Sequence, residues 1–239
     1  MSGHSKWHNI QAKKGKADAA RGKVFTKLGR ELLIAVKEGG PDPSGNSKLK
    51  NVIAKCKGAN MPNDTINNAI KKASGSNENY EEVIYEGYGT AGVAVIVNAA
   101  TDNRNRTAAD VRHAFDKSGG NLGTNGCVSY LFERKGIIVI DRTTTNLDEE
   151  EMMTFALENG ADDFEVSEEI YEIITDPTNF SDIREKFEKE NLEFLEADVK
   201  LIPSTYVELD EEQGEKMQRL IDRLEDLDDV VEVYHNWAE

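Results

Sequence analysis

The sequence predicts an α+β protein: an N-terminal three-helix bundle with a basic arm, followed by two α/β domains, the third domain (ferredoxin-like) inserted in the second. Two observations predict this class. Apolar residues recur at helical spacing in residues 17–75, and strand-length apolar runs alternate with helical stretches after residue 80. Within residues 135–203 these elements follow the order β-α-β-β-α-β, which is the ferredoxin-like pattern.

The first part of the chain is predicted to be helical after an extended arm. Residues 1–16 lack periodicity and contain two glycines, so they favour an extended conformation. Turn residues at 39–41 end the first helix, and Asn46 or Ser47 is the expected N-cap of the second. We expect helices from near Ala17 to residue 39, over the apolar stripe Leu49, Val52, Ile53 and Cys56, and from near Pro62 to Gly75.

After a polar linker at 74–80 the pattern changes to strands. The turn residues at 87–92 separate two apolar runs and favour a hairpin. A helix and a glycine-rich loop follow, and we expect a third strand after the loop. The predicted elements are strands Val83–Tyr88 and Gly92–Ala100, helix Arg104–Ser118, loop Gly119–Gly126 and strand Cys127–Phe132.

The remaining elements divide into an inserted unit and a return to the interrupted sheet. The insertion is predicted to contain strand 136–141, helix 147–158, strands 163–166 and 170–175, helix 179–190 and strand 194–202. Helix 211–227 and strand 230–234 would then complete the sheet begun at residue 81. The expected domains are residues 1–78, residues 79–133 with 204–239, and residues 134–203.

Charge is unevenly distributed along the 239 residues, whose formal net charge is −16. Residues 1–75 hold 15 basic and 5 acidic side chains, whereas residues 76–239 hold 14 basic and 40 acidic ones. This asymmetry is typical of a nucleic-acid-binding segment attached to an acidic body. A disordered basic tail on an acidic protein remains the alternative interpretation.

The candidate nucleic-acid-binding residues are therefore mainly cations of the arm and first helix. Lysine and arginine neutralise phosphates, and an interleaved tryptophan can stack on an unpaired base or pack against the bundle. Two arginines at the start of the 104–118 helix oppose its dipole, which suggests a partner or a local ion pair. The candidates are Lys6, Trp7, Lys13, Lys14, Lys16, Arg21, Lys23, Lys27, Arg30, Arg104 and Arg106.

Other motifs argue against an enzyme, and we expect no catalytic residue, cofactor or metal site. The G-x-G-x-x-G at 87–92 is followed by a strand-like run instead of the helix that a dinucleotide site needs. His4 and His8 lack further ligands nearby, and His113 has the pattern of a surface histidine. Cys56 and Cys127 form no C-x-x-C pair, so we expect free thiols, with Cys56 buried.

No apolar run is long enough to span a bilayer, and the start of the chain lacks a signal-peptide core. We therefore expect a cytoplasmic protein without a membrane partner or an evident small-molecule substrate.

Five motifs in order resemble the signatures of the YebC family. They are Gly3–Trp7–Ile10 with Lys13-Lys14-Gly15-Lys16, Asn60-Met61-Pro62, Tyr85-Glu86-Gly87-Tyr88-Gly89, Thr101-Asp102-Asn103-Arg104-Asn105-Arg106, and Gly119-Gly120-Asn121-Leu122-Gly123. Cys127 stands where the family pattern suggests a small residue such as serine. The resemblance covers essentially the whole chain and implies three domains, the third inserted in the second.

Two functions follow from that resemblance. Family members are widely labelled as transcriptional regulators that bind DNA, which is the first hypothesis. A second view places members on the ribosome, in contact with ribosomal RNA, where they relieve stalling at proline-rich sequences; mitochondrial relatives activate translation of a cytochrome oxidase subunit. A third possibility, independent of the resemblance, is a protein-interaction module whose arm only tunes solubility.

Overall fold

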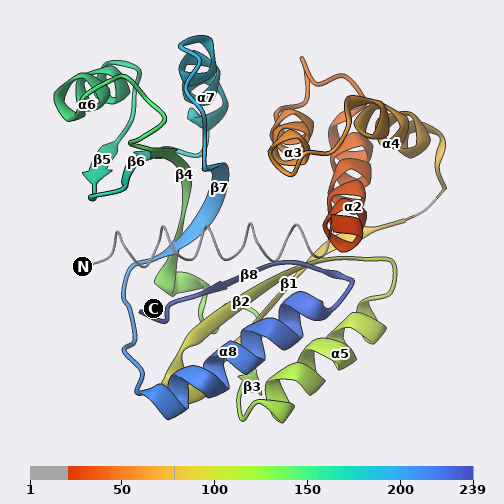
Figure 1. The fold of residues 1–239 in the computed structure, drawn as a ribbon. Helices are drawn as coiled ribbons and strands as arrows, with labels where there is room; N and C mark the ends of the chain where they lie inside the picture. The colour runs from red at the N-terminus through yellow and green to blue at the C-terminus, as the bar shows by residue number, and fades with distance from the viewer. Residues whose placement is uncertain (1–20, 78, 239) are drawn as a thin grey trace. The chain divides into compact units, whose positions relative to one another are not determined.

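The computed structural model describes residues 21–77 and 79–238 (Figure 1). Helices come first and two four-stranded antiparallel sheets with their own helices follow, which confirms the α+β class. The described residues form two compact units. The first unit takes in Arg21, 53–60 and 134–201, and the second takes in 22–52, 61–77, 79–133 and 202–238.

The N-terminal helices are α2 (Arg21–Gly39), α3 (Ser47–Gly58) and α4 (Asn63–Gly75). The expected start of the first helix near Ala17 lies outside the described residues. Of the two residues predicted as possible caps of α3, Asn46 is the one that caps it: its Oδ1 accepts a hydrogen bond from the Leu49 N–H at 3.0 Å. Its Nδ2 donates to the carbonyls of Ala35 and Gly40 at 2.7 and 2.8 Å, so one buried carboxamide joins the two helices.

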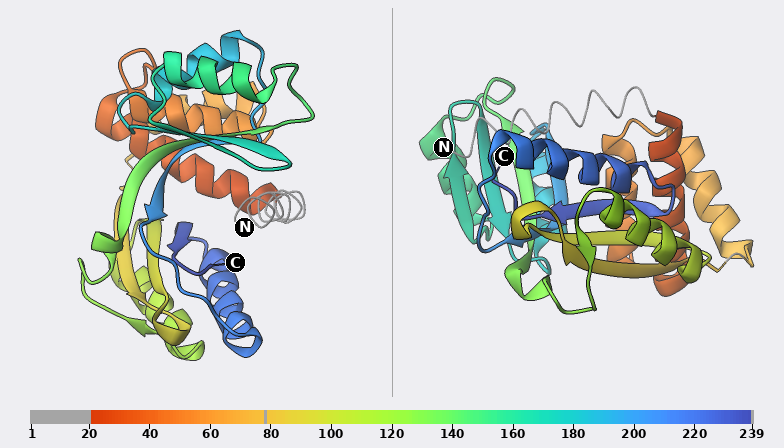
Figure 2. Two further views of the ribbon diagram at one scale, coloured as in Figure 1. Left: turned by 90° about the vertical axis from the view of Figure 1, so that its left-hand side faces the viewer. Right: turned by 90° about the horizontal axis from the view of Figure 1, so that it is seen from below.

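The sheet of the second unit has the strand order β3-β1-β2-β8. Its strands are β1 (Glu81–Tyr88), β2 (Ala94–Thr101), β3 (Asn121–Leu122) and β8 (Val230–His235). Figure 2 shows α5 (Arg104–Lys117) and α8 (Glu211–Asp226) side by side on one face of this sheet. Phe115, Leu220 and Leu224 fill the core between these helices and the strands, each at most 1% exposed.

The third strand of this sheet is shifted from its predicted place. We expected a strand over Cys127–Phe132, but β3 lies earlier, inside the glycine-rich loop, and pairs with Gly87 and Tyr88. The expected stretch instead contains a short 3-10 helix, Ser129–Leu131 (η2). The reason is that the Glu86 carboxylate accepts hydrogen bonds from the N–H groups of Gly126, Val128 and Ser129. These N–H groups are therefore not available for hydrogen bonds to a neighbouring strand.

The sheet of the first unit has the order β5-β6-β4-β7 and matches the ferredoxin-like prediction. Ile138, Ile140 and Ile173 from its strands pack with Phe180 and Phe187 in one core. The elements are β4 (Phe132–Asp141), α6 (Glu149–Glu158), β5 (Asp163–Val166), β6 (Ile170–Thr175), α7 (Phe180–Lys189) and β7 (Glu196–Pro203).

The chain returns to the first-formed sheet after β7, because β8 pairs with β2 in antiparallel register. This agrees with the expectation that the last helix and strand complete an interrupted sheet. The exact limits of three domains stay a prediction.

Candidate nucleic-acid interface

The N-terminus of α5 carries the second predicted cluster of cations. Asn103 caps the helix, since its Oδ1 accepts a hydrogen bond from the Arg106 N–H at 3.1 Å. No acidic residue stands in the first turn, where Arg104 and Arg106 face the positive end of the helix dipole. An anionic partner is needed to make this placement favourable.

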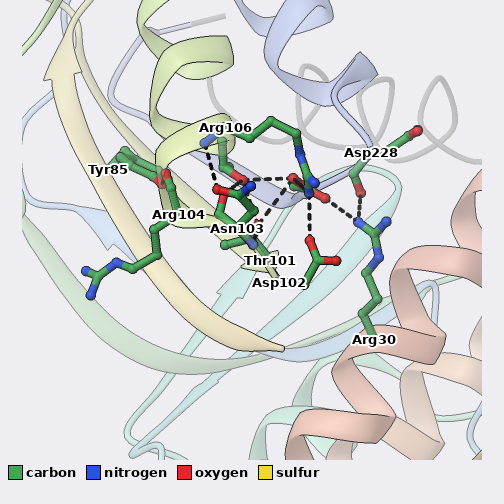
Figure 3. Close-up of polar contacts among 10 residues, drawn as sticks. Arg30, Tyr85, Thr101, Asp102, Asn103, Arg104, Arg106 and Asp228 are labelled. Carbon is green, nitrogen blue, oxygen red and sulfur yellow. Dashed lines mark hydrogen bonds and ion pairs between the residues drawn. The ribbon is translucent and has the colours of Figure 1, made fainter. Parts of the chain in front are cut away.

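Asp229 is that partner for Arg106. Figure 3 shows the polar contacts around Arg106, with Asp102 and Arg30 nearby. The Asp229 carboxylate is buried and accepts hydrogen bonds from Arg106 Nη2 at 2.7 Å and Thr107 Oγ1 at 2.8 Å. Arg30 Nη1 lies 2.9 Å from the other carboxylate oxygen. Burial by itself would raise the pKa of Asp229, but the hydrogen bonds from Arg106 and Thr107 and the two arginine charges hold it below its ordinary value.

Arg106 is therefore positioned by internal contacts. A second carboxylate, that of Asp102, accepts from Arg106 Nη2 at 2.8 Å. The hydrogen bonds to Asp229 and Asp102 raise the pKa of the Arg106 guanidinium. Of the two explanations that the sequence left open for Arg106, the structure contains the local ion pair.

Three basic residues of α2 are also engaged within the second unit. Lys23 Nζ donates to the Asp226 carbonyl at 2.6 Å, and Lys27 Nζ donates to the Glu225 carbonyl at 2.7 Å. Arg30 donates in addition to the carbonyl of Asp228 and stacks over the Tyr80 ring, 5.2 Å from its centroid. Cations are favoured at a helix C-terminus, so these three residues stabilise the end of α8.

Burial lowers the pKa of Lys27, and the neighbouring charge of Lys23 lowers it further, against the opposing effect of the nearby acids Glu225, Asp226 and Asp228. Lys27 is thus a half-buried lysine that lies between Lys23 and the acidic residues at the end of α8.

The predicted interface residues consequently fall into four groups. Arg21 begins α2, is exposed and has an interaction partner. Acidic or carbonyl groups of the second unit bind four of the candidates, Lys23, Lys27, Arg30 and Arg106. Of the two candidates on α5, Arg104 is the more exposed. Outside the described residues lie Lys6, Trp7, Lys13, Lys14 and Lys16.

Arg104 extends from the first turn of α5 into solvent. Its side chain is 62% exposed, and its closest acidic contact is Glu81, at 3.7 Å. The Arg104 carbonyl is fixed by the Tyr85 hydroxyl, which donates to it at 3.2 Å. Further along α5, the exposed Asn105 and Arg112 make no hydrogen bond or ion pair through their side chains with the described residues.

Two carboxylates at the centre of this unit were missed by the sequence analysis, Glu86 and Asp229. Glu86 is buried, and burial alone would raise its pKa; three backbone N–H donors outweigh burial and lower it. The sequence did contain a signal for Glu86, because it is an acidic residue next to glycines at the otherwise apolar end of a predicted strand. Asp229 had none, because it belongs to an acidic block that has the composition of solvated surface.

The glycines at 87–92 form a hairpin, as predicted. β1 and β2 pair in antiparallel register on either side of them. A Cβ at Gly87 would lie 2.5 Å from the Asn121 carbonyl oxygen, and one at Gly89 would lie 2.6 Å from Met217 Sδ. These glycines therefore permit close packing, and the strand that follows cannot offer a helix N-terminus to a pyrophosphate.

Metal and thiol chemistry find little support in the described residues. No group of three or more His, Cys, Asp or Glu side chains is placed there to hold a metal ion. His4 and His8 lie outside them. Cys56 is buried and Cys127 is half-buried, and neither is in a disulfide. Burial raises the pKa of Cys127, and the Glu86 charge raises it further, which makes the thiolate less accessible.

No described helix combines the length and the apolar character that crossing a membrane requires.

Two family models together cover nearly the whole chain. One, described as the TACO1/YebC protein N-terminal domain, matches residues 5–76, and one described as the TACO1/YebC second and third domain matches residues 80–237. The chain belongs to the TACO1/YebC family.

Relatives of this YebC-family chain carry regulatory names. It is 60% identical over 238 residues to a probable transcriptional regulatory protein of Clostridium novyi, covering 99% of this chain and 96% of that one. A probable transcriptional regulatory protein of Acetivibrio thermocellus is also 60% identical, with 99% of both chains covered. These names indicate a family of regulatory proteins.

The YebC-family fold is also present in a crystal structure, that of a conserved hypothetical protein from Aquifex aeolicus. It is 47% identical to this chain, has a TM-score of 0.82, and the similarity covers 94% of this chain and 93% of that one.

Proposed function

We propose that the protein is a nucleic-acid-binding regulator of gene expression that acts in the cytoplasm without catalysis, as a DNA-binding transcriptional regulator. The observation that carries this proposal is the segregation of charge. Residues 1–75 have a formal charge of +10, while the rest of the chain has −26. The acidic stretches repel phosphates, so that a polyanion is directed to the basic part and to α5, which holds four basic and two acidic side chains. The names of the relatives support the regulatory role.

The exposed face of α5 is the described surface best suited to a base-reading contact. Asn105 and Arg112 are seven residues apart and therefore lie two turns apart on one side of the helix. The small side chains of Ala108 and Ala109 lie between them and leave room for a close approach. Asparagine pairs with adenine and arginine with guanine in the major groove, and Arg104 at the helix start can contact a phosphate.

The arm supplies the electrostatic part of the proposal. If the arm and the helices contact about five phosphates of duplex DNA, the logarithm of the affinity should fall with the logarithm of salt concentration with a slope of roughly −4.5. Fluorescence anisotropy with a labelled duplex measures this slope. An affinity that does not change with salt would contradict the proposal.

Paired variants separate the surfaces. Arg112→Ala should weaken duplex binding about tenfold, the loss of one arginine contact to a base. Arg223→Ala is the matched control: it removes an exposed arginine from acidic α8 in the same unit and should leave the affinity within about twofold. Equal losses in both variants would show that only net charge matters. Lys13→Ala with Lys14→Ala should weaken binding without lowering the melting temperature.

A translation factor that contacts ribosomal RNA is the second candidate. The observation that favours it is the use of Lys23, Lys27 and Arg30 within the second unit. Because of these contacts α2, the described helix with the most basic side chains, is not free to enter a DNA groove. Structured RNA is bound by other means, such as extended basic segments. Co-sedimentation with ribosomes, compared with duplex affinity at the same salt, decides between the two candidates.

A further inference from the structure

An exposed tyrosine stands in the loop that links α5 to β4. Tyr130 is 72% exposed, which is more than any other large hydrophobic or aromatic side chain among the described residues. It belongs to η2, and its neighbour Val128 is fully buried. The exposure of Tyr130 is thus that of a side chain on an anchored backbone.

Hydrogen bonds fix this backbone on both sides of Tyr130. The Glu86 carboxylate accepts the N–H groups of Val128 and Ser129, both at 2.9 Å. On the other side, the Leu131 carbonyl accepts from the N–H and the hydroxyl of Ser204 at 2.8 and 3.1 Å. Because the backbone that carries the ring is already fixed, little backbone conformational entropy is lost when a ligand packs on Tyr130.

A second tyrosine supports the first. The Tyr88 hydroxyl donates to the Cys127 carbonyl at 2.8 Å. The neighbouring Tyr130 hydroxyl raises the pKa of Tyr88. Tyr130 thus has as a neighbour a tyrosine that is anchored to the backbone of the loop, while its own side chain remains exposed to solvent.

The surroundings of Tyr130 in the sequence are free of charge. Residues 118–132 contain no acidic or basic side chain, although the chain from residue 76 onward holds 40 acidic ones. The segment instead offers exposed Asn121, Thr124 and Asn125, whose amides and hydroxyl can both donate and accept hydrogen bonds. A phosphate-bearing ligand would meet no repelling carboxylate from this segment, and the Glu86 carboxylate beneath it is engaged with backbone N–H groups.

We infer that the 118–132 loop is a stacking platform on which Tyr130 binds one unpaired base of a single-stranded nucleic acid. The inference rests on the proposed function, since it requires that the protein bind nucleic acid. Stacking on an aromatic ring tolerates any base, and the neighbouring amides contact the base edges. An unpaired base can come from RNA or from opened DNA, and the chemistry of the platform is the same for both.

Tyr206 provides a matched control for the test. It is also a surface tyrosine of the second unit, 61% exposed, but four acidic residues follow it within six positions, Glu208, Asp210, Glu211 and Glu212. The full-length protein is titrated into labelled 12-nucleotide single-stranded RNA, single-stranded DNA of the same sequence, and the corresponding DNA duplex. Tyr130→Ala should weaken binding to single strands about tenfold. Tyr130→Phe, which keeps the ring, and Tyr206→Ala should both stay within about twofold of the wild type.

The results distinguish RNA from DNA as the source of the base, and they test the platform separately from the proposed function. A loss in Tyr130→Ala with RNA alone assigns the platform to RNA, and a loss with both single strands assigns it to unpaired bases in general; in each case duplex affinity should be unchanged. Equal single-strand affinity of wild type and Tyr130→Ala overturns the platform but leaves the proposed function intact. Tyr130 would then be assigned to contact with a protein instead of a base. A wild-type protein that binds none of the three probes at low salt overturns both.

Discussion

Asp229 and Glu86 are two buried carboxylates in the same unit, and they are stabilised by different kinds of donor. Asp229 is bound by the guanidinium groups of Arg30 and Arg106. Glu86 is bound by backbone N–H groups of its neighbouring loop. In both, hydrogen bonding outweighs burial and the pKa lies below its ordinary value. The comparison teaches that one carboxylate uses up cations predicted to bind nucleic acid, whereas the other fixes a loop without committing any cation.

The two carboxylates also differ in what they connect. Asp229 ties the start of α5 and the middle of α2 to the residue before β8, which are far apart in the sequence. Glu86 organises a single loop that lies 40 to 43 residues further along the chain. We therefore expect changes at Asp229 to destabilise the unit as a whole and changes at Glu86 to act mainly on the loop that carries Tyr130.

The largest effect is expected for Asp229→Ala. It leaves Arg30 and Arg106 without their buried counter-charge, and loss of one partner of a buried pair costs about 3–5 kcal/mol of unfolding free energy. Urea denaturation measures this. The control is Asp226→Ala, which removes the 82% exposed partner of Lys23 and should cost less than about 1 kcal/mol. Similar losses of stability in both variants would mean that the buried contacts of Asp229 with Arg30 and Arg106 contribute no more than an exposed ion pair.

Glu86→Gln should have the next largest effect and lower the free energy of unfolding by about 2 kcal/mol. The NH₂ of the new side chain must face at least one backbone N–H, and it cannot accept a hydrogen bond from that group. Hydrogen exchange should accelerate at Gly126, Val128 and Ser129 while the rest of the unit stays protected. Glu82→Gln on the same strand changes an exposed carboxylate and is the control. Unchanged exchange in the loop would contradict a role for Glu86 in holding it.

The pH dependence of stability tests both carboxylates at once. Since their folded pKa values are depressed, each contributes stability above the unfolded pKa, about 4, and that contribution is lost as the pH falls through the folded pKa. Melting temperature should therefore drop steeply in acid for the wild type and less steeply for Glu86→Gln and Asp229→Asn. Parallel curves for wild type and variants would assign the acid transition to other groups.

Salt should produce the smallest effect. The Lys23–Asp226 pair is solvent-exposed, so Lys23→Ala should cost about 0.5 kcal/mol at low ionic strength and almost nothing at about 1 M salt. The cost of Glu86→Gln should change little with salt, because its donors are neutral N–H groups in a buried site. A Glu86→Gln cost that disappears at high salt would remove the distinction between the two carboxylates.

Local patterns were sufficient for most of the fold. The stripe Leu49, Val52 and Cys56 predicted α3, and all three residues are buried. The order of elements in 135–203 predicted the sheet order β5-β6-β4-β7. The misplaced third strand marks the limit: the Cys127–Phe132 run has the composition of a strand, and the fate of its N–H groups depends on a carboxylate 40 or more residues earlier.

The candidate interface was less predictable, for the same reason. The sequence by itself determined that cations gather in the first 75 residues and that Arg104 and Arg106 stand at a helix start. Only the tertiary structure decided which of these charges are neutralised, because Asp229 approaches Arg30 from 199 residues away and Arg106 from 123 residues away. Charge is a property of composition, but its availability to a ligand depends on which opposite charges the fold brings within hydrogen-bonding distance.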